Sequence, residues 1–231
     1  MALMLVWYYK RMIQTNPLAP SRSELLEAQA ALFIAIGLQA VVWALNNHIF
    51  SEIQYVTILV ELALAFALGL TSGFKRTRGR KIQHTAAILL IAFVTLANIA
   101  SFSVVIYALL QGSIAHGPAL LGTALAIFLT NIIVFALWYW EIDSPALTDH
   151  RWTKTDKDFH FTQQSHPHDF PNWRPAFIDY LYISVINSVN GASLSANPVT
   201  KQAKLLLSVQ ALVSLFTLAL VIARSVGILD S

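Results

Sequence analysis

The sequence predicts an all-α membrane protein with about five transmembrane helices and one short re-entrant helix. Of its 231 residues, 56% are hydrophobic and only 12% are charged. The mean hydropathy is +0.60, which is well outside the composition of soluble domains. Several apolar stretches also reach the roughly 20 residues that a helix needs to cross a bilayer core of about 30 Å. The lipid bilayer is therefore the first partner that the sequence predicts.

Composition also excludes several classes of function. The chain has no cysteine, so it offers no disulfide, thiolate metal site or cysteine nucleophile. A net charge of +3 is small and needs no nucleic-acid partner to explain it. No phosphate-binding loop, dinucleotide fingerprint, nucleophile elbow or hydrolase triad occurs. We therefore expect neither enzymatic activity nor a cofactor.

The first half of the chain divides into two parts. Residues 1–23 form an N-terminal interfacial segment, because the apolar run from Met1 to Ile13 is too short to span and ends in Lys10 and Arg11. This run has no basic region ahead of it and is not expected to be a cleavable signal peptide. Residues 24–117 form a bundle of three spans, predicted at about 24–46, 53–70 and 85–110.

Glu61 lies in the middle of the second predicted span, with apolar residues on both sides. A carboxyl at the bilayer centre costs about 3 kcal/mol on insertion scales, so it should face the bundle interior. It could serve as a proton or cation site, as in a proton-coupled carrier. It could equally be a protonated acid that is hydrogen-bonded to a neighbouring helix, and the candidate partners are Gln39, Asn98 and Asn131.

The stretch Thr71 to His84 contains five basic residues and no acid, and it is predicted to be a loop. Basic residues concentrate in the cytoplasmic loops of membrane proteins. With the N-terminus in the cytoplasm, five spans place nearly all Lys and Arg residues on that side. This charge pattern predicts a multi-pass cell-membrane protein with a cytoplasmic N-terminus.

Residues 118–231 form a third part that is predicted to resemble a pore module. It comprises a span at about 119–140, a hydrophilic linker 141–174, a re-entrant helix 176–187 and a final span 203–229. The linker contains several potential metal ligands, but their spacing matches no ligand motif, so no metal site is predicted: His160, His166, His168 and Asp169. A surface loop is favoured instead, with interfacial aromatic residues at Trp152, Phe159, Phe161 and Trp173.

The apolar run from Ala176 to Ile186 is too short to cross the bilayer, so we expect it to turn back. Small and polar residues follow it directly. Non-helical backbone at membrane depth is tolerated only where it packs in protein or lines a watery cavity. The candidate pore and filter residues are Asn187, Ser188, Val189, Asn190, Gly191, Ala192 and Ser193.

Two sets of motifs carry a resemblance to known proteins over roughly the last 95 residues. The segment Tyr180 to Val185, with Pro198-Val199-Thr200 after the polar stretch, resembles the pore region of tetrameric potassium-type ion channels. The wider pattern resembles a family of uncharacterised bacterial multi-span membrane proteins, through Trp138 to Asp143, Trp173-Arg174-Pro175, Asp179 to Tyr182, Ala203 to Leu206 and Ala223 to Val226.

The resemblance implies a bacterial inner-membrane protein that conducts an inorganic ion as a homotetramer. The potassium filter TVGYG does not occur; residues 190–195 fall on its positions without a gap, and residues 188–193 do so after a shift of two. A polar filter that is not of the potassium type is therefore expected. Two alternatives stay open, a proton-coupled carrier that uses Glu61 and a non-conducting accessory subunit with a dry, packed hairpin.

The orientation of the hairpin also has two readings. A cytoplasmic N-terminus makes the hairpin dip from the cytoplasm, the reverse of potassium channels. An external N-terminus would match those channels but would place the five basic residues of the 71–84 stretch outside, so the cytoplasmic N-terminus is favoured.

Overall fold

The structure is a computed structural model that describes residues 22–46, 52–71, 77–110, 117–143, 158–166, 168–171, 173–190 and 196–229. The long helices are α2 (Arg22–Leu45), α3 (Glu52–Thr71), α4 (Thr77–Leu110), α5 (Gly117–Asp143) and α8 (Lys201–Leu229). Between α5 and α8 lie β1 (Phe159–Phe161), α6 (Thr162–Ser165), α7 (Phe177–Asn190) and β2 (Ala196–Pro198). Of the interfacial segment predicted at residues 1–23, residues 1–21 lie outside the described part of the chain, and Arg22 and Ser23 already belong to α2.

The described residues are mostly helical, in agreement with the predicted all-α class. Four helices, α2, α4, α5 and α8, are long and apolar enough to cross a membrane. The second predicted span is the 20-residue helix α3, but its apolar stretch among the described residues, Tyr55–Ala67, is shorter. A membrane location follows from the four helices by length and composition, and a fifth crossing remains a prediction.

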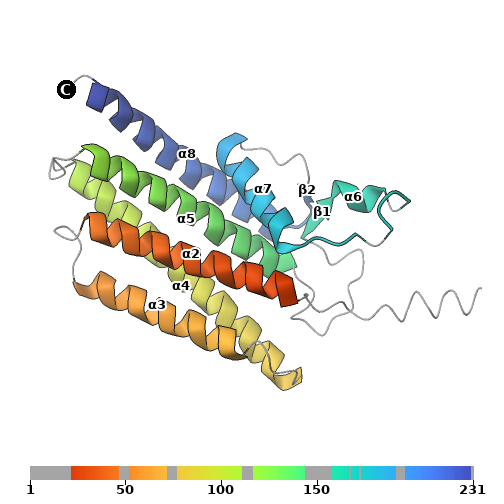
Figure 1. Ribbon diagram of the computed structural model, residues 1–231. Coiled ribbons are helices and arrows are strands. Elements are labelled where there is room, and N and C mark those ends of the chain that lie inside the picture. Colours follow the sequence, from red (N-terminus) through yellow and green to blue (C-terminus); the bar gives the residue numbers. More distant parts are fainter. Residues whose placement is uncertain are drawn as a thin grey trace, which may run out of the picture.

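The long helices form an elongated bundle in which successive helices run in opposite directions (Figure 1). Helix α5 is central, because it packs against α2, α4, α7 and α8. Helix α3 packs against α2 and α4 at one edge, and α8 lies at the opposite edge. The starts of α2, α4, α7 and α8 and the end of α5 lie at the same end of the bundle, which we call the base.

Two predicted boundaries were wrong. The predicted loop 71–84 is helical from Thr77 onward, because Arg and Lys are good helix formers and no residue after Gly79 breaks the helix. The predicted linker begins later than expected, because α5 continues to Asp143 and buries Glu141 and Asp143.

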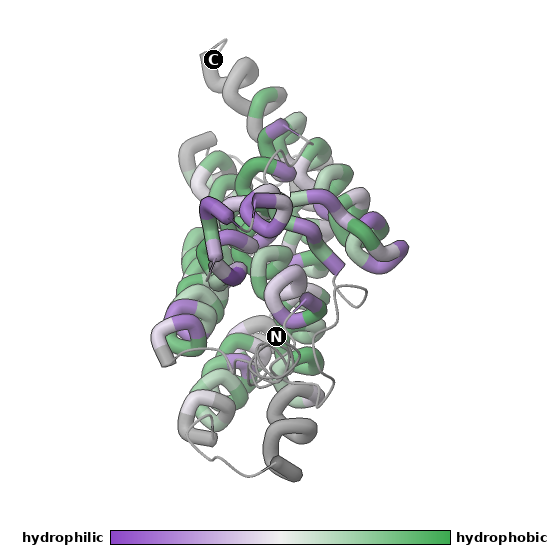
Figure 2. The backbone as a smooth tube through the Cα atoms, turned by 90° about the vertical axis from the view of Figure 1, so that its right-hand side faces the viewer, coloured by the Kyte–Doolittle hydropathy of each residue, from purple (hydrophilic) through white to green (hydrophobic). Residues whose placement is uncertain are grey.

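Figure 2 looks onto the base, where hydrophilic residues lie over mostly hydrophobic helices.

The linker contributes a small two-stranded sheet to the base. β1 pairs antiparallel with β2, with Phe159 opposite Pro198 and Phe161 opposite Ala196. Phe159 and Phe161 were expected at a surface, yet both are buried. They alternate with exposed His160, as the period of two in a strand requires, and so both rings face the bundle.

Candidate functional site

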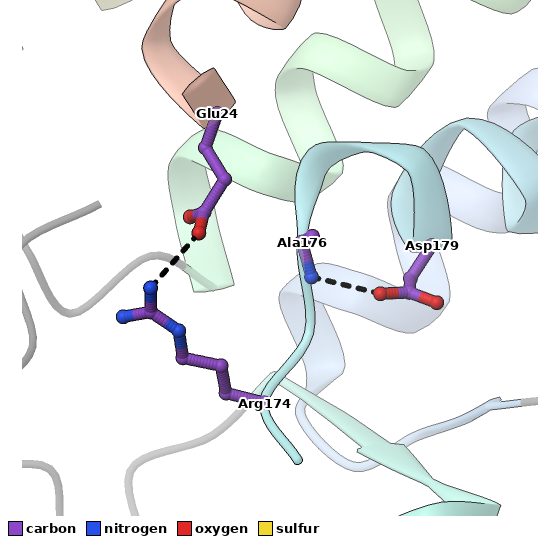
Figure 3. A network of polar contacts seen from close by, with 4 residues as sticks. All are labelled: Glu24, Arg174, Ala176 and Asp179. Atoms are coloured by element: carbon purple, nitrogen blue, oxygen red, sulfur yellow. Dashed lines mark hydrogen bonds and ion pairs between the residues drawn. The ribbon is translucent and has the colours of Figure 1, made fainter. Parts of the chain in front are cut away.

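The short helix α7 is held at its start by two polar contacts (Figure 3). The backbone N–H of Ala176 donates to Asp179 Oδ2 across 2.8 Å, which satisfies one of the free donors at the helix N-terminus. Partial burial raises the pKa of the Asp179 carboxyl, and this hydrogen bond opposes the rise. Arg174 forms an ion pair of 3.2 Å with Glu24, which ties the end of the linker to α2.

Asp143, at the end of α5, joins three segments at the base. Its Oδ1 accepts the backbone N–H groups of Asp158 and Phe159 across 2.7 and 3.1 Å. Its Oδ2 accepts the hydroxyl of Tyr180, in the first turn of α7, across 2.6 Å. Asp158 in turn accepts the hydroxyl of Thr200 and, through its carbonyl, the N–H of Val199. The starts of β1 and α7 are therefore fixed to the Asp143 carboxyl, and the segment that leads into α8 is fixed to Asp158 beside it.

Aromatic rings pack around this junction. Tyr180 lies between Phe159 and Phe161, with ring centroids 6.2 and 5.4 Å apart in edge-to-face geometry. Phe159 also meets Tyr139 at 5.2 Å, and Phe161 meets Trp173 at 5.4 Å. Edge-to-face pairs are favourable beyond the area they bury. The base of the hairpin is therefore a packed aromatic unit.

Gln210 of α8 is the centre of a buried polar network between α5, α7 and α8. Its Oε1 accepts the side-chain amide of Asn187 across 2.8 Å and the hydroxyl of Tyr139. Its Nε2 donates to the carbonyl and the hydroxyl of Ser184 and to Ser188 Oγ across 2.9 Å. Both ends of this fully buried amide are satisfied, as a polar group away from water requires.

The network continues toward the middle of the bundle. Ser214 donates to Ser188 Oγ across 3.1 Å, and Asn131 of α5 donates to Ser214 across 3.2 Å. Ser184 donates to the Ile132 carbonyl across 2.6 Å. Since Asn131 and Ser214 stand near the midpoints of α5 and α8, this chain of hydrogen bonds fixes the end of α7 at half the height of the bundle.

The predicted filter residues divide into three groups. Asn187 and Ser188 are helical and buried, and their side chains bind α8 within one chain. Val189 and Asn190 complete α7 on its exposed face, where Val189 is 61% exposed. Gly191, Ala192 and Ser193 lie outside the described residues. The helix predicted at 176–187 extends to Asn190, so four of the seven positions belong to its last turn.

The chain enters and leaves this hairpin at the same level. At a rise of 1.5 Å per residue, the 14 residues of α7 cover about 21 Å, against about 40 Å for the 27 residues of α5. By Ala196 the chain is back beside Phe161, at the first turn of α7. Helix α8 then starts at the base and runs the full height of the bundle (Figure 1).

Glu61 lies far from this hairpin, on α3. It is fully buried, and within the described part of the chain neither carboxyl oxygen has a hydrogen-bond partner. Two of its three predicted partners are engaged elsewhere: Gln39 donates to the Val94 carbonyl and Asn131 to Ser214. Nothing in the described residues supports the hydrogen-bonded reading of Glu61.

Sequence reasoning missed Asp143 and the stripe on α8. Gln210, Ser214 and Thr217 follow at i, i+4 and i+7, and all three are buried. This spacing puts them on one face of a helix, so their periodicity was a readable signal within an otherwise apolar span. Asp143 gave no such signal. Its role depends on Tyr180, 37 residues away.

Among the described residues, no group of three or more His, Asp or Glu side chains could hold a metal ion. No protein-family model, curated protein or solved structure matches the chain.

Proposed function

We propose that the chain forms a symmetric homo-oligomer in which the α7–α8 hairpins surround a pathway for an inorganic cation. A single chain supplies one hairpin, so a central pathway needs several copies around an axis. A tetramer is the arrangement that the channel resemblance implies. Among the described residues, every Lys and Arg apart from Arg224 belongs to the start of α2, α4 or α8 or to the segment before α7, all at the base, and this asymmetry supports a cytoplasmic base.

One observation carries the proposal: α7 ends at exposed Asn190, at mid-height of the bundle, and does not continue to the far end. The last four carbonyls of a helix lack partners within it. Such groups, with an exposed amide side chain, are costly against lipid at that depth. Water, ions, a neighbouring copy or other parts of the chain must therefore cover the end of α7, and a pathway supplies the first three.

The direction of α7 favours a cation. A helix carries the equivalent of about half a negative charge at its C-terminal end, and this end of α7 points to the middle of the bundle. C-terminal ends of interrupted helices and free backbone carbonyls are the groups that hold cations in membrane proteins. The filter would then be formed by the residues that follow Asn190.

Asn187 and Ser188 support this proposal in a different way from the one expected. Their side chains bind Gln210, Leu207 and Ser214, so they position α7 and are not free to replace the hydration shell of an ion. The same satisfied network also fits a non-conducting accessory subunit, in which the hairpin only stabilises the bundle. A transport measurement separates the two functions.

The test is ion flux into liposomes that contain the purified full chain, together with its oligomeric state in nanodiscs. We expect a symmetric oligomer, cation flux driven by a salt gradient, and strongly reduced flux for Asn190→Ala. Ile178→Ala is the matched control, because Ile178 is also exposed on α7 but lies in its first turn. Silent liposomes, or a monomer that still conducts, would contradict the proposal.

A further inference from the structure

Glu61 is a titratable group that the hairpin does not use. Helix α3 packs against α2 and α4, on the side of the bundle away from α8 (Figure 1). Glu61 shares its packing face with Ile58 and Ala65, at i−3 and i+4, and both of these residues are buried. The acid therefore occupies a core position of the helix–helix contact and not a position at its margin.

The contact between α2 and α3 shows what lies at this level. A Cβ atom built on Gly69 would stand 2.7 Å from Gln29 Nε2, so these two residues are neighbours across the antiparallel pair. Because the two helices are antiparallel, equal steps back along α3 and forward along α2 stay at the same level. Glu61 lies eight residues before Gly69 on α3, and Gly37 lies eight residues after Gln29 on α2. Glu61 is therefore level with the buried residues Ala35, Ile36 and Gln39 of α2.

Among the side chains that the structure describes on the helices around Glu61, no charge compensates a carboxylate there. On α2 the charged residues are Arg22, Glu24 and Glu27, all in its first turns at the base, and none follows up to Leu45. On α4 the segment Thr85–Tyr107 contains none, and the groups before it are Arg78, Arg80, Lys81 and His84. On α3 the other acid is Glu52, and the remaining titratable groups of the three helices are the phenols of Tyr55 and Tyr107.

An ionised carboxyl in this place would have neither a hydrogen bond nor a counter-charge, which is among the most costly arrangements in a protein interior. A hydrated cation is also a poor partner, because Ca²⁺ takes six to eight oxygen ligands and Mg²⁺ about six. Glu61 offers one carboxyl, with no group of acids or histidines around it in the described residues. A proton is the ligand that a solitary carboxyl can hold.

We propose that Glu61 is an intramembrane proton-binding site, neutral in the packed state and able to exchange its proton with water when α3 separates from α2 and α4. The reaction is a simple dissociation of the carboxylic acid into a carboxylate and a proton. An apolar side chain of similar size would pack there without any such cost. Among the described elements α3 packs chiefly against α2 and α4, so a displacement of this edge helix need not break the α5–α7–α8 network.

The test is infrared spectroscopy of the full chain in nanodiscs during a pH titration. We expect the carbonyl band of a protonated carboxyl at neutral pH, missing in Glu61→Gln and kept in Glu27→Gln, which alters an exposed acid of α2. Raising the pH should convert this band to a carboxylate band and lowering it should restore it, with the helical amide band unchanged. If Glu61→Gln does not fold, Glu61→Asp replaces it: this variant keeps a carboxyl, and a shift of the carbonyl band would assign the band to position 61.

A carboxylate band from Glu61 at neutral pH would overturn the proposal, and so would a protonated band that never titrates before the helices unfold. Asn190→Ala should leave the Glu61 band unchanged. The proton site and the cation pathway can therefore fail independently, since the first is measured by a spectrum at α3 and the second by flux through the hairpin.

Discussion

The side-chain amide of Asn187 donates to Gln210 Oε1 across 2.8 Å, so the end of the short helix α7 is hydrogen-bonded to α8 about one third of the way along that helix. This bond joins residues 23 positions apart, on either side of the hairpin turn. It explains how a 14-residue helix holds its place beside helices twice as long.

Gln210→Ala should destabilise the protein. The change leaves the amide of Asn187 and the hydroxyls of Tyr139 and Ser188 without one partner each. Hydrogen bonds between membrane helices average about 0.6 kcal/mol, and buried groups left unpaired cost more, so we expect a loss of about 2 kcal/mol in the free energy of unfolding. The measurement is unfolding of the full chain in mixed micelles.

Gln202→Ala is the matched control, because Gln202 is exposed in the first turn of the same helix. This variant should stay within about 0.5 kcal/mol of the parent chain. Equal losses in the two variants would mean that the buried network does not hold α7 in place.

The long helices of this fold, apart from the start of α4, could be predicted from hydropathy. The spans expected at about 24–46 and 203–229 agree with α2 and α8 to within two residues at each end. This agreement has a simple cause: an apolar stretch of membrane length is helical because every backbone polar group must be satisfied within it. The start of α4 was missed because a basic stretch was taken for a loop, although its residues favour helix.

The site could be predicted only in part. The polar segment after Ile186 was identified as the special part of the chain, but Asn187 and Ser188 were assigned to a turn and a filter. In the structure both residues are helical and their side chains are hydrogen-bonded to Gln210 and Ser214, and a local pattern does not contain such contacts. Burial of Phe159 likewise depends on its distant neighbours Tyr139 and Tyr180.

Tyr180→Phe should weaken the base of the hairpin. It removes the hydroxyl that donates to Asp143 Oδ2 and leaves the ring between Phe159 and Phe161. Because the ring still packs, the loss should be that of one buried hydrogen bond to an acid, about 1 to 2 kcal/mol in the free energy of unfolding. Tyr182→Phe is the control, since Tyr182 is 52% exposed on the opposite face of α7 and should change stability very little.

A double-mutant cycle makes this prediction specific. When Asp143→Ala is already present, the additional loss from Tyr180→Phe should shrink, because the two groups act through one hydrogen bond. Additive losses for the two variants would show that the hydroxyl of Tyr180 does not act through Asp143.

Single-cysteine labelling tests the orientation of the bundle, and the parent chain has no cysteine to interfere. Gly79 lies in the first turn of α4 at the base, whereas Gln111 directly follows the last residue of α4 at the other end. Because the basic residues gather at the base, we expect a membrane-impermeant maleimide added to intact cells to label Gln111→Cys and to spare Gly79→Cys. Opening the cells should expose Gly79→Cys to the reagent. If Gly79→Cys is labelled from outside while Gln111→Cys is protected, the base faces the exterior, and the hairpin then enters the membrane from the same side as in potassium channels.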